Sequence, residues 1–138
     1  MSNKDLFLKG RSVVYKNTVR LVLIAKYRKE VFNDFLLRVT QETIRETCEQ
    51  MDCELIAFNG ENNHVHMIVS IHPKVAISNL VGKLKGKSSY VLRRDHMDKV
   101  KKFLWGSHFW SPSYCVVSTG DASLETVKKY IRDQDRPG

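Results

Sequence analysis

Apolar and polar residues follow one another along the chain in a pattern that predicts four strands and three helices. Runs rich in β-branched residues predict strands, and apolar positions that recur every three or four residues predict helices. The strands are expected over Ser12–Ala25, Glu54–Phe58, the run Glu61–Ile71 and Tyr114–Thr119. The helices are expected over Phe32–Met51, from Ile77 to Leu92, and over Ala122–Gln134.

Turn and capping residues fix how these elements connect. Asn59-Gly60 predicts a tight turn, so the second and third strands should form a hairpin. Asp121 can cap the last helix, and the basic, aromatic segment Asp95–Ser113 is expected to be a connection. The resulting order is that of the split βαβ, ferredoxin-like fold. We therefore expect one α+β domain over residues 1–138, with an antiparallel sheet and an additional C-terminal helix at about 122–134.

Composition adds a strong positive charge to this picture. The 138 residues include 23 lysines and arginines against 15 aspartates and glutamates, which gives a net charge of +8. Such an excess favours a polyanionic partner, either nucleic acid or an anionic membrane surface. The longest apolar run, Val19–Ala25, contains Arg20 and is far too short to span a bilayer. Three cysteines with no Cys-x-x-Cys pair favour a reduced, intracellular protein, which we expect in the cytoplasm.

The expected third strand carries a histidine pair, His64 and His66. Residues i and i+2 of a strand point to the same face, so the two imidazoles should lie side by side. Neutral imidazole is the commonest metal ligand in proteins. The pair is therefore half of a candidate metal site, although His-x-His alone is a weak signal.

The expected last helix places Tyr130 and Gln134 one turn apart, beside an apolar stripe formed by Leu124, Val127 and Ile131. Tyr130 could be a nucleophile if a metal or cation activates it or its target, because a phenol is weak at its ordinary pKa of about 10. Gln134 could supply an oxygen to a cation. Taken alone, the helix favours a packing role for Tyr130.

Basic residues gather in three places, with aromatic side chains among them. The three groups are Lys26–Lys29, then Lys83, Lys87 and Arg94 on the second helix, then Lys99, Lys101 and Lys102, which precede Trp105, Phe109 and Trp110. Cations that follow phosphates and rings that stack on bases suit single-stranded or looped nucleic acid. A solvated helix face and aromatic core residues are the alternative interpretations.

Taken together, these segments resemble the single-tyrosine HUH transposases of small bacterial and archaeal insertion sequences, where HUH means His-hydrophobic-His. The similarity covers nearly the whole chain. In chain order, the matching motifs are Lys26-Tyr27-Arg28, His64-Val65-His66, Leu84-Lys85-Gly86-Lys87-Ser88, Leu104-Trp105-Gly106 with Trp110-Ser111-Pro112-Ser113-Tyr114, and Tyr130-Ile131-Arg132-Asp133-Gln134.

The resemblance implies a chemistry for these residues. His64 and His66 would bind one Mg²⁺ or Mn²⁺ per active site, with Gln134 as the third protein ligand. Tyr130 would attack a phosphodiester in single-stranded DNA, giving a 5′-phosphotyrosine and a free 3′-OH. Strand transfer would reverse this step with a different 3′-OH. The covalent bond keeps the energy of the phosphoester, so no nucleotide cofactor is expected.

The resemblance also implies partners. Family members bind imperfect DNA hairpins at element ends, and they act as homodimers in which the tyrosine helix of one subunit completes the histidine site of the other. No membrane partner is expected. The DNA-binding residues implied here are Lys26, Tyr27, Arg28, Lys83, Lys85, Lys87, Ser88, Arg94 and Trp105.

Two positions depart from the family's pattern. Members commonly carry Pro-Asp before the first histidine, where this chain has Asn62-Asn63, and a histidine in the first strand, where this chain has Arg20. Asn63 could hydrogen-bond an imidazole and orient it, but it adds no charge, so metal affinity could be lower.

Two rival functions stay open. A domesticated relative with the same chemistry would process repeated chromosomal palindromes. A non-catalytic ferredoxin-like nucleic-acid-binding module would explain the charge and the aromatic residues. It gives no reason for two histidines, a tyrosine and a glutamine to occur in these motifs.

Overall fold

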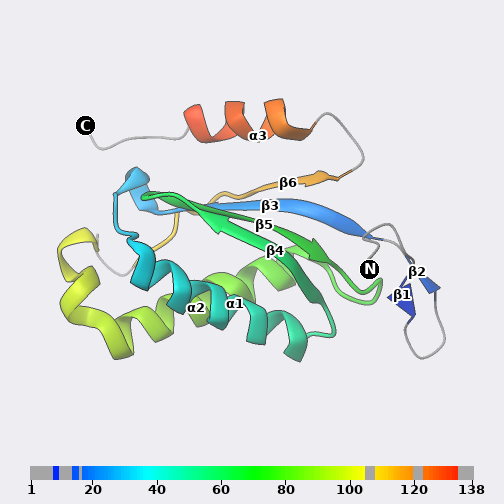
Figure 1. The fold of residues 1–138 in the computed structure, drawn as a ribbon, viewed down its shortest axis with the longest axis horizontal. Coiled ribbons are helices and arrows are strands. Elements are labelled where there is room, and N and C mark those ends of the chain that lie inside the picture. Colours follow the sequence, from blue (N-terminus) through cyan, green and yellow to red (C-terminus); the bar gives the residue numbers. More distant parts are fainter. Residues whose placement is uncertain (1–7, 10–13, 16, 105–107, 120–122, 134–138) are drawn as a thin grey trace.

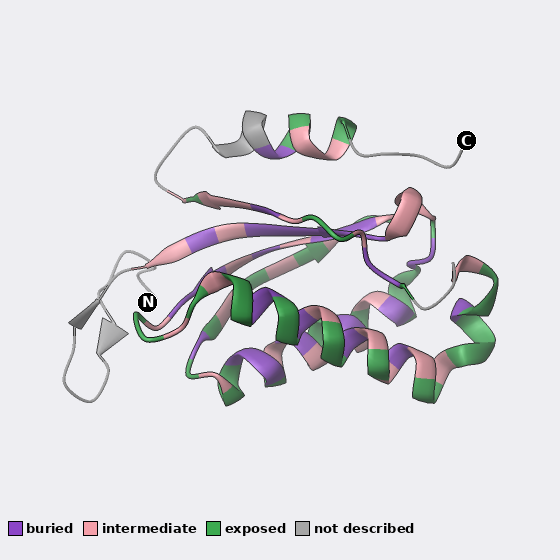
Figure 2. Ribbon diagram, turned by 180° about the vertical axis from the view of Figure 1, so that it is seen from behind, coloured by how far each residue is buried: buried purple, intermediate pink, exposed green. Residues whose placement is uncertain are grey.

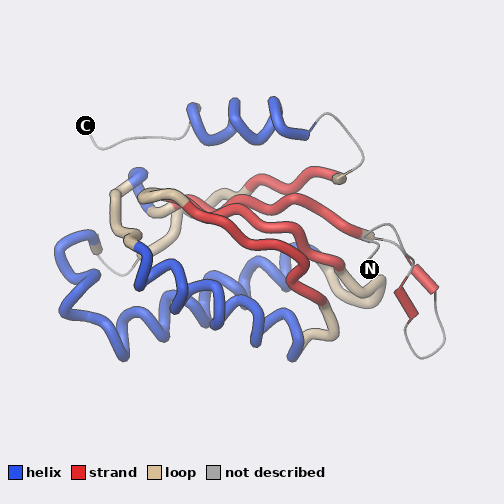
Figure 3. The backbone as a smooth tube through the Cα atoms, viewed as in Figure 1, coloured by secondary structure: helices blue, strands red, loops and turns tan. Residues whose placement is uncertain are grey.

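The computed structural model contains a four-stranded antiparallel sheet with helices on both faces (Figure 1, Figure 3). It describes residues 8–9, 14–15, 17–104, 108–119 and 123–133. The sheet has the order β4-β5-β3-β6, with β3 (Thr18–Ile24), β4 (Glu54–Gly60), β5 (His64–Ser70) and β6 (Cys115–Ser118). The helices are α1 (Asp34–Gln50), α2 (Ile77–Val100) and α3 (Ser123–Arg132). Within the described ranges, no helix has the length and apolar character needed to cross a membrane.

This topology confirms the predicted α+β, split βαβ arrangement. β3 pairs antiparallel with β5, from Thr18 opposite Ser70 to Ile24 opposite His64. The β4–β5 hairpin is also present, but its turn lies later than expected. Asn59 and Gly60 belong to β4, and residues 61–63 make the turn, which the bond from the Glu61 amide to the His64 carbonyl closes.

The predicted first strand, Ser12–Ala25, is divided into two. Val14–Tyr15 forms β2, which pairs with β1 (Leu8–Lys9) in a separate small sheet, and the strand of the main sheet begins at Thr18. The polar Asn17 interrupts the apolar run. Its side-chain amide donates to the carbonyl of Ile71 at 3.2 Å, which fixes the end of the main sheet instead of extending a single long strand.

The second helix is longer than the sequence pattern predicts. α2 continues to Val100, so the first part of the expected connection Asp95–Ser113 is helical. The extension is stabilised by packing, because Val100 at its end is fully buried. The backbone departs from helical geometry at His96 (φ −138°, ψ 31°), and a 3₁₀ turn, η2 (Lys101–Phe103), follows the helix.

Side chains of the central strands alternate between the two faces of the sheet. Leu21 and Leu23 of β3, with Val65 and Val69 of β5, face α1 and α2 and are almost completely buried. Figure 2 shows many buried positions along the central strands. Full burial of a large apolar side chain contributes about 1.5–3 kcal/mol. The main core therefore lies between the sheet and the α1–α2 layer.

On the other face of the sheet, the described residues of α3 pack over β3 and β6. Val22 and Ile24 of β3, Cys115 of β6 and Val127 of α3 form a second buried cluster there. The even-numbered positions of β5 share this face, beyond the reach of the cluster. The histidine pair thus lies on the part of the sheet that α3 leaves open.

The chain leaves β3 through the predicted basic turn, which forms the 3₁₀ turn η1 (Lys26–Arg28). Tyr27 (φ 57°) and Arg28 (φ 56°) both have left-handed backbone conformations. The amide of Lys26 donates to the carbonyl of Phe109 at 2.9 Å, so the turn is tied to the segment that leads into β6.

Candidate active site

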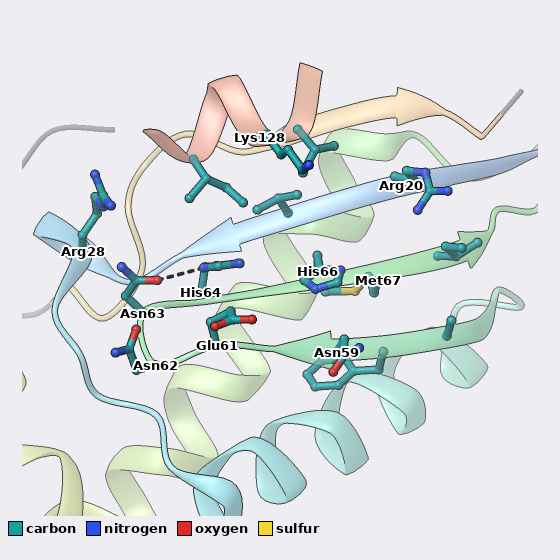
Figure 4. A pocket seen from close by; sticks show the side chains of 16 residues that line it. Arg20, Arg28, Asn59, Glu61, Asn62, Asn63, His64, His66, Met67 and Lys128 are labelled. Atoms are coloured by element: carbon teal, nitrogen blue, oxygen red, sulfur yellow. Dashed lines mark hydrogen bonds between the residues drawn. The ribbon is translucent and has the colours of Figure 1, made fainter. Parts of the chain in front are cut away.

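The open part of the sheet forms a cavity of about 580 Å³ (Figure 4). Its walls come from β3, β4 and β5, from the turn at residues 61–63, and from one side of α3. His64 and His66 line it from β5. The cavity therefore joins the predicted metal-binding pair to the helix that carries Tyr130.

The charge around the cavity is mainly positive. Arg20, Arg28 and Lys128 line it from β3, η1 and α3, and Figure 4 shows them on different sides of the histidine pair. Glu61 is the one acidic side chain among the described residues of the lining. A cavity of this charge attracts anions.

The two histidines are held as neighbours on one face, as predicted. Their ring centroids are 5.9 Å apart, with 31° between the ring planes. Burial lowers the pKa of His64, and the charge of His66 lowers it further. Burial also lowers the pKa of His66, against the opposing effect of Glu61. Both rings are therefore neutral at pH 7, which is the form that binds a metal.

Asn63 orients the first of these rings. Its Oδ1 lies 2.8 Å from Nδ1 of His64. An amide oxygen only accepts hydrogen bonds, so Nδ1 carries the hydrogen and the lone pair of the neutral ring is on Nε2. The contact expected of Asn63 is thus present in this chain, with an amide where the family pattern has a carboxylate.

The donor set fits part of a divalent-metal site. Two neutral imidazoles from one strand are suitable ligands. Among the residues that the structure describes, no group of three His, Cys, Asp or Glu side chains could hold a metal. Gln134, the predicted third ligand, lies outside the described residues, and so does Trp105.

Tyr130 is half-buried on α3, but its hydroxyl does not face the histidines. It lies 2.7 Å from the hydroxyl of Ser113, within hydrogen-bond distance. Val127, Lys128 and Ile131 of the same helix line the histidine cavity, whereas Tyr130 is not among the lining residues. Burial raises the pKa of Tyr130, and the Ser113 hydroxyl acts against this. The structure therefore brings the helix to the site but directs the phenol elsewhere.

Lys85 holds the segment that contains Ser113. Its Nζ donates to the carbonyls of Ser111 at 2.8 Å and Ser113 at 3.0 Å, and it lies over the ring of Tyr114. Burial lowers the pKa of this lysine. Lys85 was expected to contact DNA, but in this structure its ammonium group is occupied in positioning the loop beside Tyr130.

Ser88 is also a structural residue, contrary to the expected DNA contact. It is 0% exposed. Its hydroxyl donates to the carbonyl of Leu84 and accepts from Nε1 of Trp110 at 2.9 Å. A side chain that is fully enclosed and already hydrogen-bonded offers nothing to DNA, and its function here is to anchor the buried indole.

The remaining predicted DNA-binding residues lie in two separate places. Lys26, Tyr27 and Arg28 form η1, beside the histidine cavity. Lys83, Lys87 and Arg94 are exposed on α2, which covers the opposite face of the sheet (Figure 1). Arg94 is paired with Asp95 at 2.7 Å. The structure thus separates the basic helix from the histidine site by the thickness of the sheet.

Sequence reasoning did not assign Lys128 or Ser113 to the site. Lys128 could have been found, because it follows Val127 in the apolar stripe and so lies at the border of that stripe. Ser113 gives no such signal. Its contact with Tyr130 depends on the path of the loop at residues 111–113, which no periodicity describes.

Comparison with known proteins defines the family. The model of the family described as "Transposase IS200 like" matches residues 13–134. The chain belongs to this family. Over 128 residues, this IS200-like transposase is 32% identical to the ISDra2 transposase TnpA of Deinococcus radiodurans, covering 91% of this chain and 89% of that protein. Over 120 residues it is 29% identical to the transposase for insertion sequence element IS200 of Salmonella typhimurium, covering 86% and 78%.

Solved structures support the same fold for this IS200-like transposase. A Deinococcus radiodurans crystal structure described as a transposase superposes with a TM-score of 0.84 at 28% identity, covering 94% of this chain and 99% of that one. A REP-associated tyrosine transposase bound to a REP hairpin gives a TM-score of 0.55 at 12% identity, covering 90% and 68%. The second likeness is one of fold alone.

Proposed function

We propose that this chain cleaves and rejoins single-stranded DNA at insertion-sequence ends, with Tyr130 as the nucleophile. The observation that carries the proposal is the neighbouring pair His64 and His66, with Asn63 orienting the ring of His64, on the sheet face where α3 also packs. The names of the relatives, transposases of insertion sequences, support the same class of reaction.

In the proposed cleavage, the phenolic oxygen of Tyr130 attacks the scissile phosphorus and loses its proton to solvent. The bond from phosphorus to the 3′ oxygen breaks, and that oxygen takes up a proton to become a free 3′-OH. The 5′ end stays bound to the protein as a phosphotyrosine. Rejoining is the reverse reaction, in which another 3′-OH attacks the phosphorus and Tyr130 is released. A phosphoester is conserved in each step, so no nucleotide is consumed.

His64, His66 and Gln134 would hold the divalent ion that the reaction needs. When bound, the ion supplies charge neutralisation at the oxygens of the reacting phosphate. Imidazole nitrogen suits Mn²⁺ better than Mg²⁺, which prefers oxygen ligands. The protein's own part is to keep the imidazoles neutral by burial and to direct Nε2 of His64 into the cavity through Asn63.

Substitution of Asn63 should lower or raise the affinity for metal, depending on the side chain that replaces it. Asn63→Ala removes the acceptor for Nδ1 of His64 and is expected to weaken Mn²⁺ binding by about tenfold or more, as outer hydrogen-bond partners of metal ligands commonly do. Asn63→Asp keeps the oxygen, adds a negative charge and should strengthen binding. Isothermal titration with Mn²⁺ measures both. Asn62→Ala, at the neighbouring lining position, is the control, and equal affinities for all four proteins would contradict the orienting role.

DNA is the proposed partner, with two contact regions. Lys26, Tyr27 and Arg28 lie beside the histidine cavity and suit the strand that is cut. The exposed Lys83, Lys87 and Arg94 of α2 suit a folded hairpin. A hairpin partner is in line with the REP-associated transposase of the same fold, which was solved bound to a REP hairpin.

A homodimer with shared sites is part of the proposal. The Tyr130 hydroxyl is bonded to Ser113 and not directed at the histidines of its own chain, and α3 leaves the β5 side of the face open. The tyrosine helix of a second copy could therefore complete this site. This reasoning supports assembly between subunits over assembly within one chain.

Labelled single-stranded DNA provides the direct test of function. The strand is taken from the DNA that flanks the gene, incubated with the protein and Mn²⁺, and separated on a denaturing gel. We expect a covalent protein–DNA adduct that EDTA prevents. Absence of an adduct on a strand that the protein binds would favour the non-catalytic binding module. An adduct on repeated chromosomal palindromes, but not on the flanking DNA, would favour the domesticated relative.

A further inference from the structure

Among the residues that the structure describes, Arg20 is a charged side chain in the candidate active site with no carboxylate partner. It is half-buried on β3 and lines the histidine cavity. Its Nε is buried and has no hydrogen-bond partner. In the part of the chain that the structure describes, no carboxylate forms an ion pair with Arg20. Because Nε is enclosed, an incoming acceptor meets the terminal Nη–H groups of the guanidinium, which are not buried in this way.

The position of Arg20 is fixed relative to the histidines by strand register. Arg20 lies opposite Ile68, and Val22 lies opposite His66. Arg20 is thus the diagonal neighbour of His66, about 7–8 Å away between backbones and within reach of a long side chain. In Figure 4, Arg28, His64, His66 and Arg20 follow one another across the cavity.

The charges around Arg20 favour an anion as its ligand. Arg28 and Lys128 add positive charge to the cavity lining, and Glu61 lies at the turn, next to His64 rather than beside Arg20. A guanidinium presents parallel N–H donors that match the oxygens of a phosphate. The same cavity is where the proposed function places a DNA phosphodiester.

We propose that Arg20 binds the DNA phosphate adjacent to the scissile one, with its terminal Nη–H groups donating to the two free oxygens of that phosphate. This inference rests on the proposed function, since it needs a single strand in the cavity. The histidine pair takes the scissile phosphate. Arg20 of β3 lies opposite Ile68, which is the next position on this face of β5 after His66, so it holds the neighbouring linkage and sets the register of the DNA strand. It acts in binding and does not depend on the metal.

The test is a binding experiment in EDTA, where no cleavage occurs. A fluorescein-labelled single strand from the gene's flanking DNA is titrated with the full chain, and anisotropy is followed at several salt concentrations. Arg20→Met removes the charge but keeps a long stem. Arg38→Met, on the exposed side of α1, removes the same charge away from the cavity. We expect Arg20→Met to weaken binding about tenfold or more and to reduce the salt slope by about one, with a much smaller effect from Arg38→Met.

Strands with one neutral methylphosphonate linkage locate the contact. The wild-type chain should lose affinity when the linkage next to the cleavage site is neutral, and Arg20→Met should lose nothing further at that linkage. Arg20→Lys keeps the charge but not the two parallel donors, and should recover only part of the affinity. If circular dichroism shows that Arg20→Met is poorly folded, Arg20→Lys is compared with wild type on these strands instead.

The outcomes separate this inference from the proposed function. A wild-type adduct, together with equal salt slopes and equal methylphosphonate profiles for wild type and the Arg20 variants, would overturn the contact and leave the function intact. In the opposite case, the wild-type chain forms no adduct, but it loses affinity at one neutral linkage and this loss requires Arg20. That result would support the contact and overturn the catalytic proposal.

Discussion

Tyr130→Phe is expected to abolish the covalent DNA adduct while leaving DNA binding within about twofold of wild type. The substitution removes only the phenolic oxygen, which is the one atom that forms the new bond to phosphorus. No substitute nucleophile is expected, because water attack would release DNA without attaching it to the protein. The loss of adduct should be at least about 10³-fold, as is usual when an enzyme loses its covalent nucleophile.

The measurement is a denaturing gel of labelled strand after incubation with Mn²⁺. Tyr114→Phe is the matched control, since Tyr114 is half-buried near the same loop and its hydroxyl makes no hydrogen bond within the described residues. Tyr114→Phe should form the adduct as wild type does. An adduct that survives in Tyr130→Phe would show that another side chain attacks the phosphate.

A mixture of His64→Ala and Tyr130→Phe chains is expected to recover adduct formation that neither chain shows alone. If the tyrosine of one subunit serves the histidines of the other, each mixed dimer contains one intact site. Random pairing then makes about a quarter of all sites active, against none for sites built within one chain. The Tyr130–Ser113 hydrogen bond motivates this expectation, because it directs the phenol away from the histidines of its own chain.

This experiment needs proof that the chains exchange. The two variants carry different affinity tags, and the mixed dimer is purified through both tags before it is given DNA. The attached DNA should be found on the His64→Ala chain, which keeps its tyrosine. Purified mixed dimers without adduct would show that both halves of the site come from the same chain.

The main sheet could be predicted because its physical signal is local. Alternation along β5 places Val65, Met67 and Val69 in the core and leaves His64 and His66 on the other face, so one pattern determines both the strand and the neighbouring imidazoles. The extra turns of α2 could not be predicted in this way. Val100 is apolar but isolated among charged residues, and its burial depends on tertiary contacts that no short window of sequence contains.

The candidate site was predicted less completely, for a related reason. Helical spacing placed Tyr130 at the border of the apolar stripe, where a small difference in orientation decides whether the hydroxyl meets Ser113 or the histidines. The motif that contains Lys85 and Ser88 suggested DNA contacts, but burial occupies both side chains inside the fold. A sequence motif identifies residue types. The folded structure determines which of their hydrogen-bond donors remain available to a ligand.

The left-handed pair Tyr27 and Arg28 has a consequence for how this chain could be improved. Each such residue other than glycine costs about 1–2 kcal/mol, a large share of the stability of a small domain. Selection for thermal stability alone would therefore favour glycine at both positions. Such a variant would unfold at a higher temperature, but it would lose an aromatic ring and a guanidinium from the edge of the site. At this turn, thermal stability and activity therefore place opposite demands on the sequence.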